Sequence, residues 1–241
     1  PEFVRPVDLE LMERLVAAGK GHITNMTVAP ELKGMRELAL YCIKQGIVLQ
    51  AGHTDATYEN MREGMQAGIL HSTHFFNAMS RLHHRDPGAV GAIMIHSELS
   101  CEIIADGHHV HPDLIRLLLR DKPVSKVVLV TDSLKPTEQC CGPCIANREE
   151  VELRDGVFMR KTDDVIAGSA LTMIRGLENI VSWGTPIENA IEMGASNPAR
   201  ILGLGKRGLL VPGYAADIVV FDREWKVNAC LVGGRFVKNE L

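Results

Sequence analysis

The sequence predicts an α/β protein built on a parallel sheet. As far as residue 130, short apolar strand patterns alternate with helical patterns. The strand patterns end at Gly, Pro or polar residues, and a helical or small-residue stretch leads to the next strand. Five such β/α units in a row require crossover connections between parallel strands, because hairpins cannot join strands of the same direction.

The predicted elements follow from composition and spacing. Five segments have the apolar content of strands: residues 25–29, 47–51, 69–73, 101–105 and 126–130. Four segments have helical spacing: residues 6–18, 31–44, 55–67 and 112–120. We expect Thr54 or Asp55 to cap the third helix and Pro112 to occupy the first turn of the fourth. An irregular loop over 79–88 and a small-residue stretch over 89–94 separate the third and fourth strands.

The pattern changes after Asp132. Residues 151–159 predict a hairpin around Arg154-Asp155-Gly156. Two helices are expected over 171–183 and 186–193, and the tail predicts strands over 216–222 and 227–237. The second half therefore adds antiparallel strands to the parallel sheet of the first.

Composition excludes several classes of partner. The formal net charge of −4 argues against nucleic acid and against an anionic membrane surface. No apolar run reaches the roughly 20 residues of a membrane span, and the first residues lack the pattern of a signal peptide. We expect Cys42, Cys101 and Cys230 to be reduced core residues in a cytoplasmic protein. The cluster Cys140, Cys141 and Cys144 lacks a nearby fourth soft ligand, which favours a thiol-rich loop tip over a zinc knuckle.

Polar residues stand where the predicted strands end. Glu31, His53, His74 and Asp132 each close a strand, and His109 lies just beyond another. Because the C-terminal ends of parallel strands share one edge, these residues are expected to converge. Each has a plainer alternative: a lone His can be a loop residue, Asp132 can cap a turn, and Glu31 is better explained as a charge at the start of its helix.

Two His and one Asp are the ligands and the base expected around a divalent cation. Imidazoles suit a divalent cation such as zinc or ferrous iron, which would acidify a bound water. A carboxylate beside that water could accept its proton and pass it to a leaving group.

An ordered series of motifs covers essentially the whole chain: Thr27-Val28-Ala29-Pro30-Glu31, Ala51-Gly52-His53-Thr54-Asp55-Ala56-Thr57, Thr73-His74-Phe75-Phe76-Asn77-Ala78-Met79, Ala105-Asp106-Gly107-His108-His109-Val110, Val130-Thr131-Asp132, Ala167-Gly168-Ser169-Ala170-Leu171-Thr172-Met173, Asn197-Pro198-Ala199-Arg200 and Pro212-Gly213-Tyr214-Ala215-Ala216-Asp217. In this order the motifs resemble those of the N-acetylglucosamine-6-phosphate deacetylases of the amidohydrolase superfamily. One such motif is weakly specific, whereas the ordered set is strongly so.

The resemblance implies a (β/α)8 TIM-type barrel with a small β-sandwich. Five of the eight β/α units are found here, so the expected fold is an incomplete barrel over residues 1–212, followed over 213–241 by the C-terminal strands of the small β domain.

The resemblance also implies the roles of individual residues. His53 and His74 would bind the metal, and Asp132 would be the catalytic acid and base. His109 would lie beside the acetyl carbonyl or a sugar hydroxyl. Asn77 and the backbone of Ala78 would face the substrate phosphate, with Arg85 as the nearby cation. Arg85 could instead be a solvated loop charge, and His83 and His84 are expected to be loop residues.

The chain departs from the family pattern in its ligand set. The family's third metal-site ligand is a Glu in a His-x-Glu-Gly-Pro stretch, and this chain has no such stretch. The segment 133–144 is also unlike the family's. We therefore expect a C-terminal portion of a deacetylase that releases acetate from N-acetylglucosamine 6-phosphate. The alternatives are another amide hydrolase of the superfamily, or a folded module without catalysis. Exposed edges of an incomplete sheet favour a homo-oligomer, expected to be a dimer.

Overall fold

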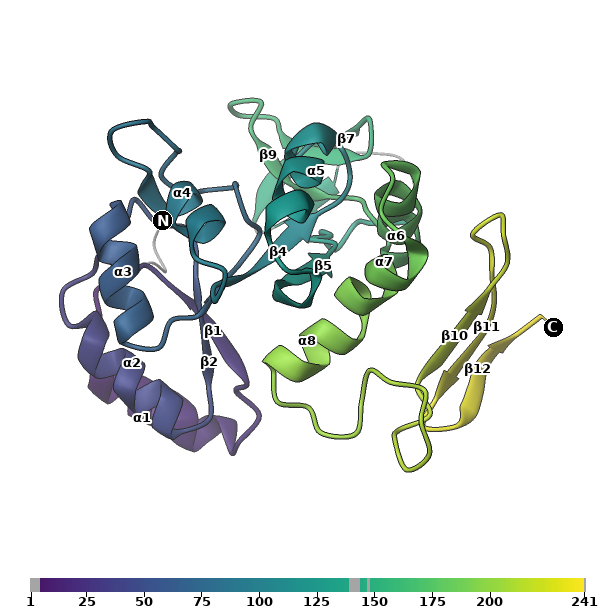
Figure 1. The fold of residues 1–241 in the computed structure, drawn as a ribbon, viewed down its shortest axis with the longest axis horizontal. Helices are drawn as coiled ribbons and strands as arrows, with labels where there is room; N and C mark the ends of the chain where they lie inside the picture. Colours follow the sequence, from purple (N-terminus) through teal and green to yellow (C-terminus); the bar gives the residue numbers. More distant parts are fainter. Residues whose placement is uncertain (1–4, 139–143, 147, 241) are drawn as a thin grey trace. The chain divides into compact units, whose positions relative to one another are not determined.

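The predicted strands pair into one sheet whose order follows the sequence, β1-β2-β3-β4-β5 (Figure 1). The computed structural model describes residues 5–138, 144–146 and 148–240. The five strands are β1 (Asn25–Val28), β2 (Val48–Ala51), β3 (His71–Ser72), β4 (Ser100–Ile104) and β5 (Val127–Val130). The pairs β1–β2, β2–β3 and β3–β4 are all parallel, which confirms the α/β prediction.

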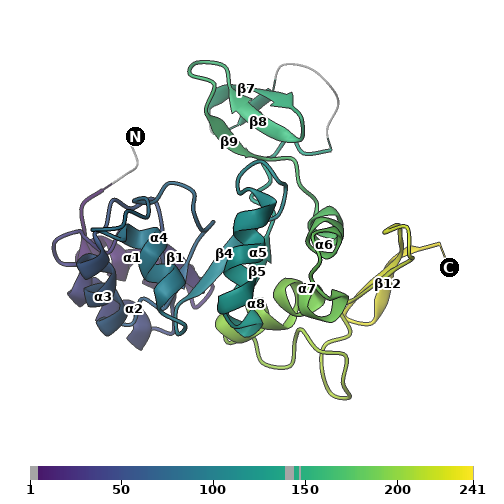
Figure 2. The ribbon, with the colours of Figure 1, turned by 45° about the horizontal axis from the view of Figure 1, so that its top comes forward.

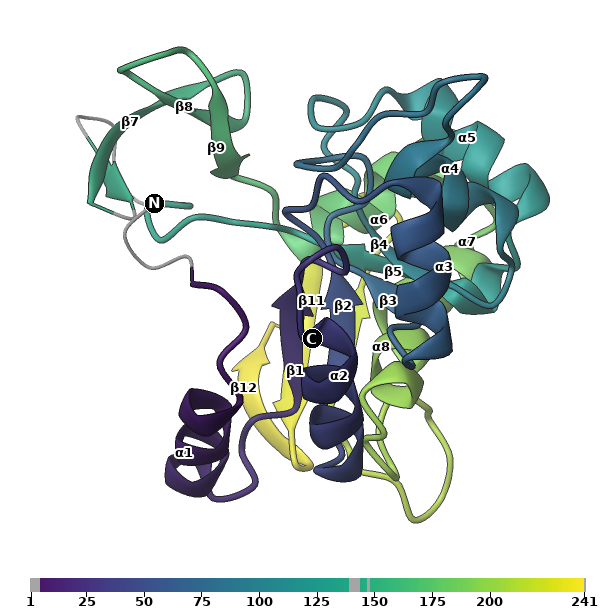
Figure 3. The ribbon, with the colours of Figure 1, turned by 90° about the vertical axis from the view of Figure 1, so that its left-hand side faces the viewer.

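Residue contacts divide the chain into two units within β4, after Glu102. The predicted division into a barrel part, residues 1–212, and a small β domain, residues 213–241, is not the division seen here and stays a prediction. The first unit holds the first three strands and four helices: α1 (Leu9–Gly19), α2 (Met35–Lys44), α3 (Tyr58–Gln66) and α4 (Gly88–Ile95). Helix α2 covers one face of β2 (Figure 3). The apolar residues between them, including Leu38, Cys42 and Leu49, are almost fully buried.

Side-chain caps set the starts of two of these helices. The Asp8 carboxylate accepts the amide hydrogen of Leu11 at the start of α1. Thr57, rather than Thr54 or Asp55 as expected, caps α3, and Asn60 completes a reciprocal capping box. Such a cap stabilises a helix by about 1 kcal/mol. The predicted cap was wrong because α3 begins only at Tyr58; the hydroxyl of Thr54 instead donates to Glu31 and accepts the amide hydrogen of Ala56.

The small-residue stretch after the irregular loop forms α4. Gly88, Ala89, Val90, Gly91, Ala92 and Ile93 are all buried. A helix that is apolar on every side belongs inside a protein. A Cβ added at Gly91 would lie 2.3 Å from Pro87 Cβ, so glycine is required for this close packing.

In the second unit, helices follow the remaining strands. They are α5 (Pro112–Asp121), the short 3₁₀ helix η1 (Val124–Lys126), α6 (Met173–Ser182), α7 (Ile187–Gly194) and α8 (Ser196–Ile201). Pro112 occupies the first turn of α5, as predicted. The side-chain amide of buried Asn197 donates to the carbonyls of Val124 and Val127, both at 2.8 Å, and so ties α8 to the start of β5.

Two antiparallel sheets complete this unit. The first contains β6 (Cys144–Ala146), β7 (Glu149–Arg154), β8 (Val157–Arg160) and β9 (Ile166–Ser169), and confirms the predicted hairpin (Figure 2). Phe158, Val151 and Ala146 form its small core. The second contains β10 (Ile218–Phe221), β11 (Val227–Val232) and β12 (Arg235–Asn239), which confirms the predicted strands of the tail.

Cysteine burial agrees with the expectation in two of three cases. Cys42 and Cys101 are buried, whereas Cys230 is only half-buried. Cys144 is also half-buried, and Cys140 and Cys141 lie outside the described residues. Among the helices that the structure describes, none combines the length and the apolar character that crossing a membrane requires.

Candidate functional site

Three candidate site residues share an unusual backbone conformation. His53, His74 and Asp132 each lie two residues after the last residue of their strand, β2, β3 and β5. Their φ angles are 47°, 27° and 50°, in the left-handed region that non-glycine residues rarely adopt. This conformation costs about 1–2 kcal/mol per residue. Strain of this kind gathers at functional sites, where the surrounding structure holds a side chain in a required position.

The structure brings the two candidate metal ligands together. The Nε2 atoms of His53 and His74 are 2.9 Å apart, and their rings meet edge to face. His53 is exposed and His74 half-buried. The other ring nitrogen of His74, Nδ1, is buried and has no hydrogen-bond partner. Two imidazole nitrogens in this arrangement must share a proton or a cation, because their lone pairs otherwise repel.

These two residues fit a divalent cation as donors. Neutral imidazole is the commonest protein ligand for zinc and also suits iron. Within the described part of the chain, no cluster of three or more His, Cys, Asp or Glu side chains could hold a metal. A cation held by this pair would therefore need further donors.

A half-buried carboxylate holds the backbone at His74. Glu102 Oε2 accepts the Thr73 hydroxyl at 2.9 Å and the His74 amide hydrogen at 3.2 Å. Its other oxygen, Oε1, accepts the amide of Gln50 at 2.8 Å and lies 3.5 Å from Nε2 of buried His71. Glu102 therefore joins the loop after β3 to β2 and β4.

A second carboxylate holds the segment that follows His53. Glu31 accepts the Thr54 hydroxyl at 2.5 Å and the Asp55 amide hydrogen at 2.9 Å. Because α2 begins at Met35, Glu31 does not lie in the first turn of that helix, and the expected helix-charge role was wrong. Its oxygen atoms instead fix the turn that carries a candidate ligand.

The charge state of Glu102 leads to a prediction on stability. Burial is the largest single influence and would raise the pKa of Glu102. The hydrogen bond and charge of His71, with the donors from Thr73 and His74, together outweigh it and lower the pKa below the ordinary value. A carboxyl group with a lowered pKa stabilises the fold above its unfolded pKa of about 4.3, and this contribution is lost as the pH falls through the folded pKa.

We therefore expect the free energy of unfolding, measured in urea, to fall as the pH drops below about 4.3. Glu102→Gln should lower it by about 2–4 kcal/mol at pH 7 and flatten this part of the pH dependence. Glu59→Gln is the matched control, because Glu59 is 60% exposed and pairs only with Arg62 in a surface ion pair. An unchanged pH profile in Glu102→Gln would show that Glu102 does not contribute as described.

In the second unit, the candidate residue His109 is buried beside Asp106. Their side chains are 5% and 4% exposed, and Nδ1 of His109 lies 2.5 Å from Oδ2 of Asp106. Asp106 Oδ1 also accepts the amide hydrogens of His108 and His109, each at 2.9 Å. The pKa of Asp106 is lowered, since these bonds outweigh its burial, which alone would raise it.

The loop of Asp132 is held by β9. The carbonyl oxygen of Asp132 accepts the Ser169 amide hydrogen at 2.9 Å, and the Ser169 hydroxyl donates to the Thr131 carbonyl. A Cβ at Gly168 would lie 3.0 Å from the Asp132 carbonyl oxygen and 2.8 Å from the Leu134 side chain. The motif Ala167-Gly168-Ser169 thus supports the backbone of Asp132, whose side chain is exposed.

The candidate phosphate ligands lie in the loop after β3. Asn77 donates its side-chain amide to the carbonyls of His74 and Phe75, at 3.3 and 3.2 Å, and so closes the turn that carries His74. Ala78 has a φ of 49°, and its carbonyl accepts from Thr54. Arg85 is exposed and contacts Nε2 of His84 at 2.8 Å.

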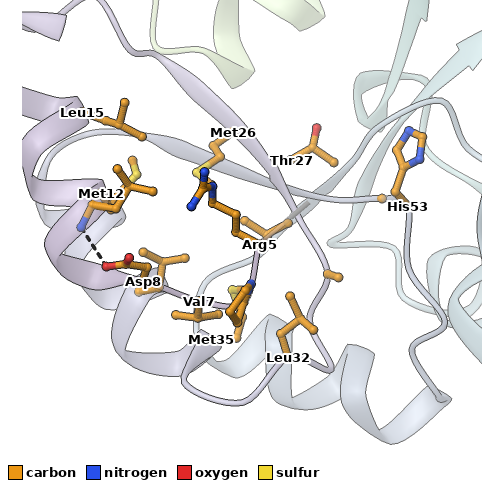
Figure 4. A pocket seen from close by; sticks show the side chains of 16 residues that line it. Arg5, Val7, Asp8, Met12, Leu15, Met26, Thr27, Leu32, Met35 and His53 are labelled. Carbon is orange, nitrogen blue, oxygen red and sulfur yellow. Dashed lines mark hydrogen bonds between the residues drawn. The ribbon is translucent and has the colours of Figure 1, made fainter. Parts of the chain in front are cut away.

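A cavity of about 430 Å³ lies in the first unit. Apolar side chains such as Met12, Leu15 and Met26 line one end, and His53 lies at the other (Figure 4). Apart from Arg5, Asp8 and His53, its lining has no charged or titratable side chain. Asp8 already caps α1. The lining is therefore mainly apolar.

Sequence reasoning missed the supporting groups Glu102, Asp106 and Ser169. The only signal for Asp106 and Ser169 was their presence inside the motifs quoted above. Glu102 gave a different signal, an acid between apolar residues of a predicted strand, where a charge requires a partner.

Known proteins resemble this chain over nearly its whole length. The Amidohydrolase family profile matches residues 5–237. The chain is 34% identical to the N-acetylglucosamine-6-phosphate deacetylase of Vibrio furnissii over 238 residues, 98% of this chain and 59% of that protein. It is 33% identical to the N-acetylgalactosamine-6-phosphate deacetylase of Escherichia coli O157:H7, over 98% of this chain and 62% of that protein.

Solved structures agree with the sequence comparisons. A variant of the Mycobacterium smegmatis N-acetyl-D-glucosamine-6-phosphate deacetylase in complex with N-acetyl-D-glucosamine-6-phosphate has a TM-score of 0.94 at 32% identity, over 99% of this chain and 64% of that chain. The Thermotoga maritima N-acetylglucosamine-6-phosphate deacetylase has a TM-score of 0.91 at 30% identity, over the same shares of the two chains. The chain thus spans about three-fifths of the length of the curated relatives it matches.

Proposed function

The chain belongs to the amidohydrolase family, and from this membership we propose that the whole protein hydrolyses the acetamide group of N-acetylglucosamine 6-phosphate. The products are glucosamine 6-phosphate and acetate. The observation that carries the proposal is the pair of imidazoles, His53 and His74, whose Nε2 atoms lie 2.9 Å apart on strained turns that follow neighbouring strands.

His53 and His74 would hold a divalent cation, with zinc or ferrous iron as the expected metals. A third donor would be a Glu outside this chain. Such a cation polarises the amide carbonyl and acidifies a water molecule. Glu31 and Glu102 support the site by fixing the backbone next to the two ligands.

The chain's own residues would then move the protons. Asp132 accepts a proton from the attacking water, and the water oxygen forms the new bond to the carbonyl carbon. His109 stabilises the negative charge that develops on the carbonyl oxygen. Protonated Asp132 then donates to the amine nitrogen as the carbon–nitrogen bond breaks, which leaves acetate and restores the carboxylate.

The 6-phosphate would bind at the loop after β3. The backbone of Ala78, the side chain of Asn77 and the Arg85 guanidinium are the proposed ligands. Arg85 is suited to this role because its guanidinium can donate two parallel hydrogen bonds to one phosphate. Its exposure leaves it accessible to an incoming ligand.

The substrate assignment is tested by comparing N-acetylglucosamine with its 6-phosphate. In the protein made from its complete reading frame, we expect kcat/KM to be at least about 100-fold higher for the phosphorylated sugar, since a charged hydrogen bond to phosphate stabilises by about 1.5–3 kcal/mol and several would act together. Arg85→Ala should reduce this ratio, whereas Arg116→Ala, at an exposed arginine on α5, should leave it unchanged. Equal rates on both sugars would contradict a phosphate-binding loop and favour another amide hydrolase of the family.

A second candidate substrate is N-acetylgalactosamine 6-phosphate, which the 33% identical relative from Escherichia coli supports. The two sugars differ only at the 4-hydroxyl, so the same assay with both phosphates ranks them. We further propose a cytoplasmic homodimer. The free thiols of Cys42 and Cys230 support a reducing compartment, and light scattering on the purified protein tests the dimer.

A further inference from the structure

The proposed mechanism uses His109 but gives no role to Asp106, the carboxylate paired with it. Asp106 is not among the groups assigned above, yet its carboxylate is almost fully buried and bonded through both oxygens. Burying a charge is costly unless it is paired, so a carboxylate in such a place has a partner that it must hold.

The geometry gives Asp106 two tasks in one loop. Oδ1 accepts the backbone amide hydrogens of His108 and His109, and thereby closes the turn. Oδ2 lies 2.5 Å from Nδ1 of the His109 ring. Backbone and ring of His109 are therefore fixed by the same carboxylate.

The loop is also held at the residues around Asp106. The side chain of Asn179 on α6 donates to the carbonyl oxygen of Ala105 at 2.7 Å. Gly107 has a φ of 79°, a conformation that glycine adopts without strain, and Trp183 lies 3.6 Å from the position of a Cβ there. These contacts hold the backbone on both sides of Asp106 in place.

We infer that Asp106 is the positioning residue of His109: it binds Nδ1–H, fixes the ring tautomer and leaves Nε2 as the working atom toward the substrate. An ionised carboxylate can only accept, so the hydrogen of this bond belongs to the imidazole. The lowered pKa of Asp106 agrees with an ionised carboxylate.

The pairing also explains how His109 could stabilise a developing oxyanion. In the neutral ring with Nδ1–H, Nε2 has a lone pair and cannot donate. A second proton on Nε2 makes the ring a cation that donates from Nε2 to the carbonyl oxygen, and the adjacent carboxylate compensates that charge. This part rests on the proposed deacetylase function, whereas the tautomer assignment does not.

The tautomer can be measured directly in the 241-residue chain. In protein with ¹⁵N-labelled histidine, long-range correlations from the ring carbon protons show which ring nitrogen carries hydrogen. The signals of His109 are identified as those missing in His109→Gln. Above neutral pH, we expect Nδ1 of His109 to be protonated and Nε2 to be bare. A ring protonated at Nε2 with bare Nδ1 would overturn the inference without any variant of Asp106.

Asp106→Asn then tests the role of the carboxylate. We expect the variant to lose the fixed Nδ1–H tautomer and, in the protein made from its complete reading frame, to lose at least about 100-fold in kcat with a smaller change in KM. Asp113→Asn is the matched control, because Asp113 lies near His111 at 3.7 Å but both side chains are about 70% exposed. It should change neither the His109 signals nor kcat.

The outcomes separate this inference from the proposed function. The expected tautomer without deacetylation of any amino-sugar phosphate would support the role of Asp106 and contradict the deacetylase. Deacetylation with an unchanged tautomer and kcat in Asp106→Asn would contradict the role of Asp106 alone.

Discussion

Asp132→Asn is expected to lower the deacetylation rate by about 10²–10⁴-fold, because general acid–base catalysis typically contributes that much and an amide cannot exchange the proton. The substitution should leave the fold intact. Asn is similar in size, and it adopts the left-handed backbone conformation seen at Asp132 more readily than most residues do. The measurement is kcat on N-acetylglucosamine 6-phosphate with protein made from the complete reading frame.

The hairpin turn between β7 and β8 offers a matched control. Asp155 is exposed and has the same φ of 50° as Asp132, so Asp155→Asn makes the same chemical change on the same backbone conformation. It should retain full activity. Near-normal turnover in Asp132→Asn, with the control also active, would refute the acid–base assignment.

Loss of either imidazole of the His53–His74 pair is expected to abolish tight metal binding. Changing a group that only supports a metal ligand already costs about 10–100-fold in affinity, so removing a ligand itself should cost more than about 100-fold. Zinc affinity is measured by calorimetric titration of the wild-type protein, His53→Ala and His74→Ala, all made from the complete reading frame. The matched control is His84→Ala, because His83 and His84 are also adjacent rings, 4.2 Å apart, on an exposed loop.

The 241-residue chain itself provides a second comparison. With two His and no third donor among the described residues, it should bind zinc weakly. Tight stoichiometric zinc in this chain, or unchanged affinity in His74→Ala, would contradict the proposed ligand set.

The parallel sheet could be predicted because its strands are short apolar runs with clear ends. The positions that follow those runs also located the candidate site, since His53, His74 and Asp132 all lie two residues beyond a strand. A sequence shows such positions directly, because they depend only on local order along the chain. Their strained backbone could not be foreseen, since nothing in a His or Asp requires a positive φ.

The supporting carboxylates depend on contacts between distant residues. Glu102 meets Gln50 and Thr73 only because the parallel strands pair in one register, with Gln50 opposite His71 and His71 opposite Ser100. A shift of one residue would turn those side chains to the other face. A single sequence does not determine that register.

The cap of α3 was predicted at the wrong residue, and here too a contact between distant residues is involved. Thr54 and Thr57 are equally good caps by residue type. In the structure α3 begins at Tyr58, directly after Thr57, whereas Thr54 belongs to a turn in which its hydroxyl donates to Glu31, 23 residues away in the sequence. Strand β9 was missed for a related reason: Ile166–Ser169 contains Gly168 with its backbone held close to Asp132, and its small residues do not resemble a strand.

Central to the proposal is one cation shared by His53 and His74, with the Asp132 carboxylate beside it. Anomalous diffraction at the zinc edge, from crystals of the zinc-loaded protein made from its complete reading frame, tests this directly. The proposal predicts one strong peak about 2.0–2.1 Å from a ring nitrogen of each His, with Asp132 next to the same peak. A peak at other residues, or an Asp132 carboxylate remote from the bound zinc, would contradict it.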